Sequence, residues 1–105
     1  MEIIETTVFT GRIKDVLSDN EYSELQQALV INPSAGVVIP GGGGLRKLRW
    51  AVSGKGKSGG LRIIYYWHVG NDRIYMLFVY KKSEQADLTN KQLAILKEHV
   101  KGGLL

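Results

Sequence analysis

The side chains of this sequence with the clearest chemistry are the arginines and lysines of its central part. Between residues 25 and 71 there is no Asp or Glu. The same window contains six bases, namely Arg46, Lys47, Arg49, Lys55, Lys57 and Arg62. Cations gathered without balancing acids attract polyanions, and nucleic acid is the commonest of these. The first 24 residues are acidic instead. The sequence therefore predicts a domain with one cationic face.

Two predicted strands, at 45–52 and 61–69, position most of these side chains, because both segments alternate in character along the chain. If the strands pair through the turn at 53–60, their outward faces join into one surface. We expect that surface to carry Lys47, Arg49, Arg62, Tyr66 and His68, with Lys55 and Lys57 at its rim. Surface cations are often only solvated. Cations interleaved with aromatic rings nevertheless suit the phosphates and unpaired bases of RNA, which favours binding.

A second group of polar residues follows the predicted strand at 74–80. Tyr80, Lys81 and Lys82 close that strand, and they extend the same surface if the strand lies next to it. Glu84 and Asp87 lie close together before the last helix, where an acid is usually a capping or surface residue. We find no Ser/His/Asp arrangement. The cations therefore remain the leading candidates for a site.

The remaining patterns supply the elements that position these residues. Predicted strands lie at 3–6, 36–39, 45–52, 61–69 and 74–80. Predicted helices run from Phe9 to Leu17, from the Ser18–Glu21 capping box to Asn32-Pro33, and from Thr89 to Gly102-Gly103. The order β-α-α-β-β-β-β-α predicts an α+β fold with a mainly antiparallel sheet packed on helices. At 105 residues we expect a single domain over 1–105.

Several other chemistries fit the sequence poorly. There is no cysteine, and the basic window has no carboxylate, so we expect no metal site and no cofactor. The string AVSGKGKS at 51–58 fits a loose phosphate-loop pattern, but we expect a strand after it where the motif requires a helix. No apolar run is long enough to span a membrane, and the acidic start lacks the basic region of a signal peptide. We expect a cytoplasmic protein.

The string GGLRKLRWAVSGKGKSGGLRIIYY at 43–66, with YKKSEQADL at 80–88, resembles the HigB-type branch of the RelE superfamily of bacterial toxins. The early helical segment that ends at Asn32-Pro33 also fits, so the resemblance covers nearly the whole chain. It implies a microbial-ribonuclease-like fold and a ribosome-dependent endoribonuclease that cuts messenger RNA in the decoding site. It also implies a cognate antitoxin that holds the protein inactive.

The resemblance implies roles for individual residues. Arg62 matches the arginine that stabilises the phosphate, and Lys82 or Lys81 matches a basic residue after the last strand. The strand whose side chains position the RNA and assist proton transfer corresponds to Arg46, Lys47 and Arg49.

The sequence departs from the family at the general base. Some relatives place a tyrosine near the start of the last helix, where this chain has Leu88, so Tyr80 or Tyr66 takes that role. The catalytic histidines and C-terminal aspartate of other relatives are not matched. The identity of the base is therefore left open.

These observations predict RNA cleavage without a metal. The 2′-hydroxyl attacks its own phosphate, leaving a cyclic phosphate and a free 5′-hydroxyl, while Arg62 neutralises charge on the phosphorane. Lys47 or Lys55 acts as an acid or base if crowding by other cations favours its neutral form. We expect catalysis from Arg62, Lys47, Arg49, Tyr80 and Lys82, and RNA or ribosome binding from Arg46, Lys55, Lys57, Tyr66, His68 and Lys81.

Two other functions stay open from the sequence. One is an RNA- or ribosome-binding module without turnover, which would use the same cationic surface. The other is a DNA-binding accessory protein, against which the absence of a predicted recognition helix counts. For the endoribonuclease, the expected partners are messenger RNA on the ribosome, ribosomal RNA and the antitoxin.

Overall fold

The computed structural model describes residues 1–52 and 60–102, and these form an α+β fold. The elements in chain order are β1 (Glu2–Glu5), α1 (Thr7–Val16), α2 (Asp19–Ile31), β2 (Val37–Val38), β3 (Leu45–Trp50), β4 (Leu61–His68), β5 (Arg73–Lys81) and α3 (Asn90–Gly102). The predicted fold class and element order are both confirmed. The segment after Gly60 is the strand β4, which confirms that no helix follows the phosphate-loop-like string.

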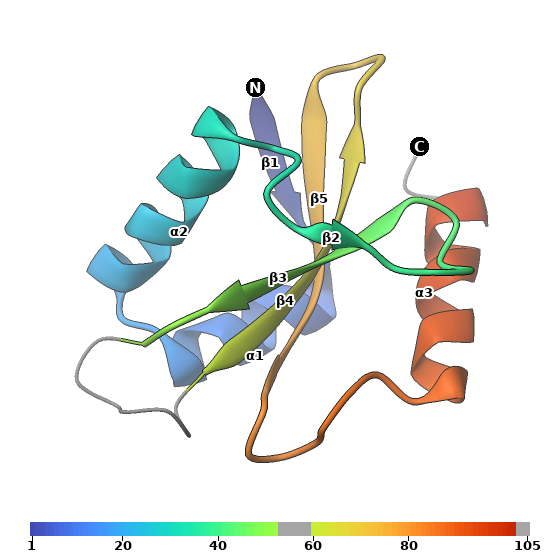
Figure 1. Ribbon diagram of the computed structural model, residues 1–105. Helices are drawn as coiled ribbons and strands as arrows, with labels where there is room; N and C mark the ends of the chain where they lie inside the picture. The colour runs from blue at the N-terminus through green and yellow to red at the C-terminus, as the bar shows by residue number, and fades with distance from the viewer. Residues whose placement is uncertain (53–59, 103–105) are drawn as a thin grey trace.

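Within the described residues, the strands form one sheet in the order β1-β5-β4-β3-β2. The pairs β2–β3, β3–β4 and β4–β5 are antiparallel, whereas β1 runs parallel to β5. The first strand of the chain is therefore placed beside the last one. Figure 1 shows the resulting strong twist, with β3 and β4 crossing the direction of β1 and β5.

Helices cover both faces of the sheet. On one face, α1 and α2 pack apolar residues such as Phe9 and Leu25 against Ile63 and Met76. On the other face, α3 packs its apolar stripe against a second cluster that includes Ile64. Figure 1 shows α2 and α3 on opposite sides of the strands. Any side chain that projects from the central strands therefore shares one of these two faces with a helix.

The helix ends follow the predicted capping signals. The Ser18 side chain accepts a hydrogen bond from the Glu21 amide, and Glu21 accepts one from the Ser18 amide. Thr89 and Gln92 form the same reciprocal pair at the start of α3. Among the described residues, no helix is both long and apolar enough to cross a membrane.

A bulge in β5 decides which side chains reach the α3 face. Ile64 pairs with Phe78, but Tyr65 pairs with Met76, so Leu77 is an extra residue in β5. An extra residue reverses the alternation of side chains on either side of it. The bulge therefore brings Tyr80 to the α3 face, and Tyr80 lies opposite Arg62 in the register.

One expectation about β4 is wrong. The face that carries Ile64 and Tyr66 was predicted to be outward, but Ile64 is fully buried, and Tyr66 packs against the cluster under α3. A strand at the centre of a sheet with helices on both sides is buried on both faces. The continuous cationic surface along β4 is therefore interrupted by α3.

Candidate functional site

Three side chains form a row across the sheet on its α3 face. Arg49 of β3 lies opposite Arg62 of β4, and Arg62 lies opposite Tyr80 of β5. Residues directly opposite each other in an antiparallel pair share a face and lie side by side. The register thus brings together three of the predicted catalytic residues from three strands.

Arg62 is the buried charge of this row. Its side chain is 8% exposed, and Nη1 donates a hydrogen bond to the Leu61 carbonyl at 3.2 Å. No acidic side chain pairs with it among residues 1–52 and 60–102. A buried charge without a counter-charge costs free energy, and a bound anion removes that cost. The guanidinium is therefore suited to bind a phosphate.

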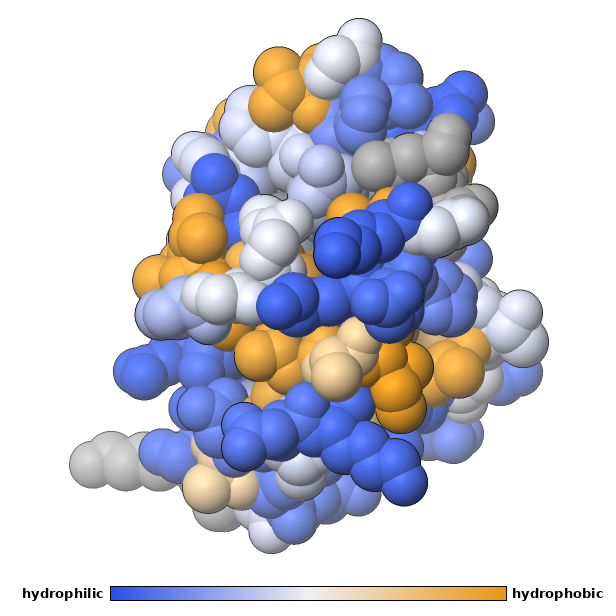
Figure 2. Space-filling view, turned by 90° about the vertical axis from the view of Figure 1, so that its right-hand side faces the viewer, coloured by the Kyte–Doolittle hydropathy of each residue, from blue (hydrophilic) through white to orange (hydrophobic). Residues whose placement is uncertain are grey.

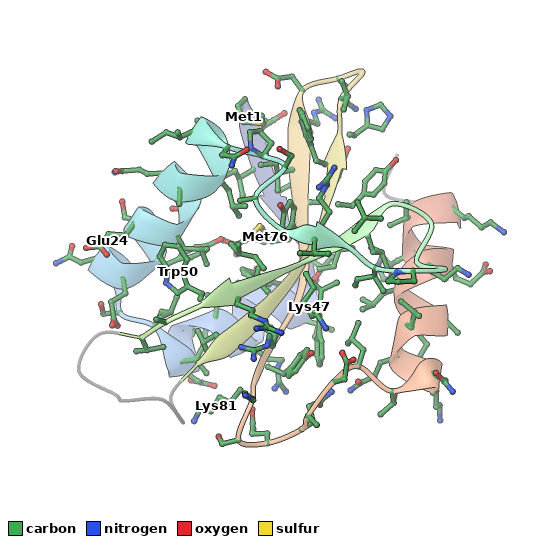
Figure 3. The ribbon with its side chains drawn as sticks, viewed as in Figure 1. Met1, Glu24, Lys47, Trp50, Met76 and Lys81 are labelled. Atoms are coloured by element: carbon green, nitrogen blue, oxygen red, sulfur yellow. The ribbon has the colours of Figure 1, made fainter. Side chains whose placement is uncertain are left out.

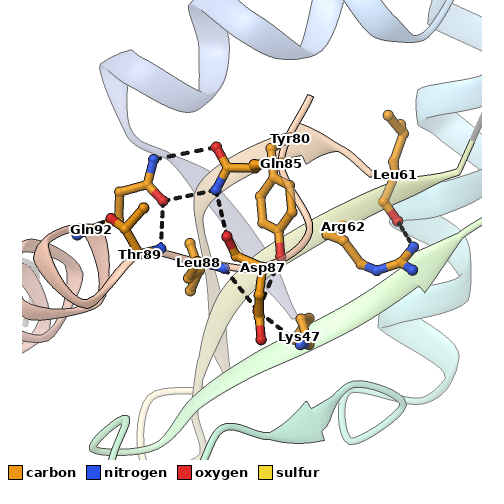
Figure 4. A network of polar contacts seen from close by, with 9 residues as sticks. All are labelled: Lys47, Leu61, Arg62, Tyr80, Gln85, Asp87, Leu88, Thr89 and Gln92. Atoms are coloured by element: carbon orange, nitrogen blue, oxygen red, sulfur yellow. Dashed lines mark hydrogen bonds and ion pairs between the residues drawn. The ribbon is translucent and has the colours of Figure 1, made fainter. Parts of the chain in front are cut away.

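Asp87 joins the row from the segment between β5 and α3. Its Oδ1 atom lies 3.1 Å from Lys47 Nζ, 2.8 Å from the Leu88 amide and 3.5 Å from the Tyr80 hydroxyl (Figure 4). The Leu88 amide, followed by Lys47, lowers the pKa of Asp87 below its usual value. The group is therefore a carboxylate at neutral pH. The sequence pattern predicted only a capping or surface acid at Asp87, because the contact with Lys47 joins residues 40 apart in the chain.

The environment of Tyr80 keeps its hydroxyl protonated. Burial raises the pKa of Tyr80, the negative charge of Asp87 raises it further, and Arg62 opposes the shift. At neutral pH the phenol is a hydrogen-bond donor and not a base. The hydroxyl points to Asp87, as Figure 4 shows.

The charges around Lys47 differ from those that the sequence suggested. The sequence suggested that Lys47 is crowded by other cations, whereas its nearest charged partner is the Asp87 carboxylate. The Lys47 side chain therefore lies at the site as one member of an ion pair, 3.1 Å from Asp87 Oδ1. Figure 3 shows its side chain on the α3 side of β3, with Trp50 on the side of α2.

A groove of about 320 Å³ opens beside this ion pair. One wall is the edge strand β2 with the following Ile39 and Pro40, and the other wall is Leu88 with Leu93 of α3. Lys47 and Asp87 lie at the groove, so the charged groups and the apolar walls belong to one concave site.

A second groove of similar size lies between the start of α1, β5 and α3. Its lining is mainly apolar, and Val8 and Ile95 are exposed beside it. Figure 2 shows apolar atoms gathered in the middle of the α3 side, between hydrophilic surfaces. The residues that line it do not include Arg49, Arg62 or Lys47, so this groove is separate from the cationic row.

Arg46 does not belong to the row. It lies opposite Tyr65 in the register and so points to the other face of the sheet. Its Nη1 donates to the carbonyls of Gly36 at 2.9 Å and Ser34 at 3.3 Å. Arg46 was predicted to bind RNA or the ribosome, and its place on the other face separates it from Lys47 and Arg49, because neighbours in a strand point to opposite faces.

Tyr66 and His68 share the face of Arg62 but lie towards the far end of β4. Tyr66 packs against Gly44, whose φ is +100°, and a Cβ at that glycine would come within 2.8 Å of the ring. His68 accepts a hydrogen bond from the Asn71 amide in the β4–β5 turn. Six residues of strand separate His68 from Arg62 by about 20 Å. The expected joint surface of these residues is therefore wrong.

The two lysines after Tyr80 are exposed at the end of the row. The Lys82 amide donates to the Gly60 carbonyl at 3.0 Å, so Lys82 follows β5 at the end of β4 that carries Arg62. Lys81 pairs with Leu61 and points to the face of α1 and α2. The other predicted binding residues, Lys55 and Lys57, lie outside the described residues.

A comparison with known families gives one match over nearly the whole chain. The family described as the RelE toxin of the RelE/RelB toxin-antitoxin system matches residues 2–104.

Proposed function

The chain belongs to the RelE toxin family, and we propose that it is a ribosome-dependent endoribonuclease of the HigB-type branch that cleaves translated messenger RNA. The family is that of the toxin of a toxin-antitoxin system, which implies an antitoxin as partner. Inhibition of translation in the cytoplasm, and neutralisation by that antitoxin, belong to the same proposal.

The observation that supports cleavage most directly is the burial of Arg62 without an acidic partner in the described part of the chain. A structural arginine at this depth is normally paired. An arginine that binds substrate is instead left for the incoming anion. Its neighbour Arg49 adds a second cation in the same row.

The proposed reaction is an attack of the 2′-hydroxyl on the adjacent phosphorus. The bond to the 5′-oxygen breaks, and the products are a 2′,3′-cyclic phosphate and a 5′-hydroxyl end. Water takes the proton of the 2′-hydroxyl, and the Lys47 ammonium donates one to the departing oxygen. Arg62 and Arg49 neutralise the charge that develops on the phosphorane, and a fixed donor of this kind contributes about 3–4 kcal/mol.

Tyr80 acts in this scheme as a donor. Because its pKa is raised, it keeps its proton, and its hydroxyl can turn from the long 3.5 Å contact with Asp87 Oδ1 to donate to a phosphate oxygen. Lys82 is exposed at the end of the row and contributes positive charge to the bound strand.

The test is induced expression of the wild-type chain in a bacterium, with mapping of transcript 5′ ends. We expect protein synthesis to stop and new 5′ ends to appear inside translated codons. The matched control is Arg62→Met, which keeps a similar volume and removes the charge. Normal growth with intact transcripts at high expression of the wild type would instead support an RNA- or ribosome-binding module without turnover.

A further inference from the structure

The groove beside Lys47 and Asp87 has a volume of about 320 Å³, which leaves room for a flat ring. Its walls are apolar, with Val37 of β2 on one side and Leu93 of α3 on the other. Val37 pairs with Lys47 in the register, so both side chains lie on the α3 face, and Val37 is 73% exposed. Proteins commonly bind an unpaired base between apolar side chains and read its edge with polar groups.

A polar edge is available at one end of this groove. The three donors that contact the Asp87 carboxylate all converge on Oδ1. Among the described residues, no hydrogen bond is made to Oδ2, and the side chain is 65% exposed. Asn90, which also lines the groove, adds an amide that donates and accepts. A ligand with N–H groups therefore meets an acceptor that the protein leaves free.

The groove is continuous with the cationic row. Lys47 and Arg49 are two residues apart on β3, which separates them by about 7 Å. Arg49 lies beside Arg62, so a phosphate at the two arginines leaves its neighbouring base within reach of the groove. The charges thus fit a phosphate at one end and the donor edge of a base at the other.

We propose that this groove binds one base of a single RNA strand, next to the phosphate held by Arg62, and that Asp87 selects bases that carry an amino group. Adenine, cytosine and guanine present such N–H donors to the carboxylate. Uracil presents carbonyl oxygens on both sides of its single ring N–H, and these repel a carboxylate. This assignment rests on the proposed function, since it names the part of the site that sets base preference.

The experiment uses trinucleotides of 2′-O-methyl RNA, which lack the attacking hydroxyl and cannot be cleaved. The central base is A, C, G or U, the flanking bases are uridine, and the dissociation constant of the purified protein is measured at fixed salt. We expect the three probes with an amino-bearing base to bind at least about fivefold more tightly than the all-uridine probe.

Two variants assign this preference to the groove. Val37→Phe fills the groove and should reduce the difference among probes to less than about twofold, while the salt dependence of binding stays. Val69→Phe is the matched control, because Val69 is similarly exposed, at 68%, but follows β4 at the turn to β5, and it should keep the full difference. Asp87→Asn replaces an acceptor by an amide and should move the preference towards uridine.

Equal binding of all four probes by the wild type would overturn the inference, as would full discrimination by Val37→Phe. If binding to the isolated protein is too weak to measure, the bases that flank mapped cut sites provide the same comparison between Val37→Phe and Val69→Phe. Discrimination by a protein that does not cut RNA would refute the proposed function alone. Cutting with no dependence on the groove would refute this inference alone.

Discussion

The two faces of β4 differ although their side chains alternate along one strand. Ile63 points towards α1 and α2 and is fully buried in an apolar cluster. Its neighbour Arg62 points to the α3 face and is almost as buried, yet it carries a charge with no acidic partner in the described residues. Burial stabilises the fold at Ile63 and opposes it at Arg62. One strand thus serves stability with one face and the site with the other.

The largest expected effect is that of Arg62→Met on RNA cutting. Removing the charge should lower the single-turnover rate on reconstituted ribosomes by about 10²–10³. The free energy of unfolding should stay equal or rise, because an apolar side chain replaces an unpaired buried charge. Chemical denaturation measures the second quantity. A variant that loses stability would show that Arg62 supports the fold, and the two faces would then not differ as described.

On the opposite face of β4, we expect a change in stability without a change in cutting. Ile63→Val removes a single methylene from the apolar cluster and should lower the free energy of unfolding by about 0.5–1.5 kcal/mol. Cutting should be unchanged at temperatures where the variant is folded, since Ile63 does not point to the row. A marked loss of activity in the fully folded variant would mean that the α1–α2 face also shapes the site.

A smaller effect is expected from the polar neighbour of Arg62. Tyr80→Phe removes one donor and should slow cutting by about tenfold. Because the pKa of Tyr80 is raised, less of this group should be ionised at pH 10 than the half that is expected for an ordinary tyrosine, so ionisation should lower the wild-type rate only at higher pH. A pH–rate profile of both proteins provides the measurement. A fall near pH 9 that vanishes in Tyr80→Phe would contradict the assignment of a protonated donor.

The same shift has a consequence for stability, with a sign that follows from the raised pKa. Folding favours the protonated form of Tyr80. The stabilisation that Tyr80 gives to the folded state is therefore complete below the unfolded pKa near 10. It is lost as the pH rises towards the folded pKa. Alkaline unfolding should therefore begin at higher pH in Tyr80→Phe than in the wild type.

A small effect on cutting is also expected from two lysines outside the row. Lys55 and Lys57 lie outside the described residues, and the sequence alone predicts that they contact ribosomal or messenger phosphates. The double change to alanine should flatten the salt dependence of ribosome binding by about 0.7–0.9 per lost contact. Cutting on saturated ribosomes should change by less than about twofold. An unchanged affinity with a much slower single turnover would place one of these lysines in the chemical step.

The features that the sequence predicted correctly are those with local causes. The capping boxes at Ser18 and Thr89 act over three residues, and the alternation of β3 follows from the pleat of a single strand. The candidate row depends instead on long-range geometry. The bulge at Leu77 sets the face of Tyr80, and the contact of Asp87 with Lys47 joins distant segments. The periodicity of apolar residues in the sequence predicts neither the bulge nor this contact.

The misassigned face of β4 has a different origin. The pattern of Arg62, Ile64 and Tyr66 looked outward because it begins with a charge, although the next two side chains are apolar or aromatic. A strand covered on both sides reads as nearly continuous apolar sequence, and β4 has this character over most of its length.

Because β1 pairs with β5, the sheet cannot be completed until late in the synthesis of the chain. Residues 2–5 are synthesised first, but their strand partners are residues 73–76. At elongation rates of about 5–20 residues per second, the first strand waits roughly 4–14 s for its partner to be translated. A nascent chain that stops before β5 already contains Arg49 and Arg62, but it has neither Tyr80 nor Asp87. The ribosome therefore completes this site only near the end of translation, and a prematurely released fragment lacks it.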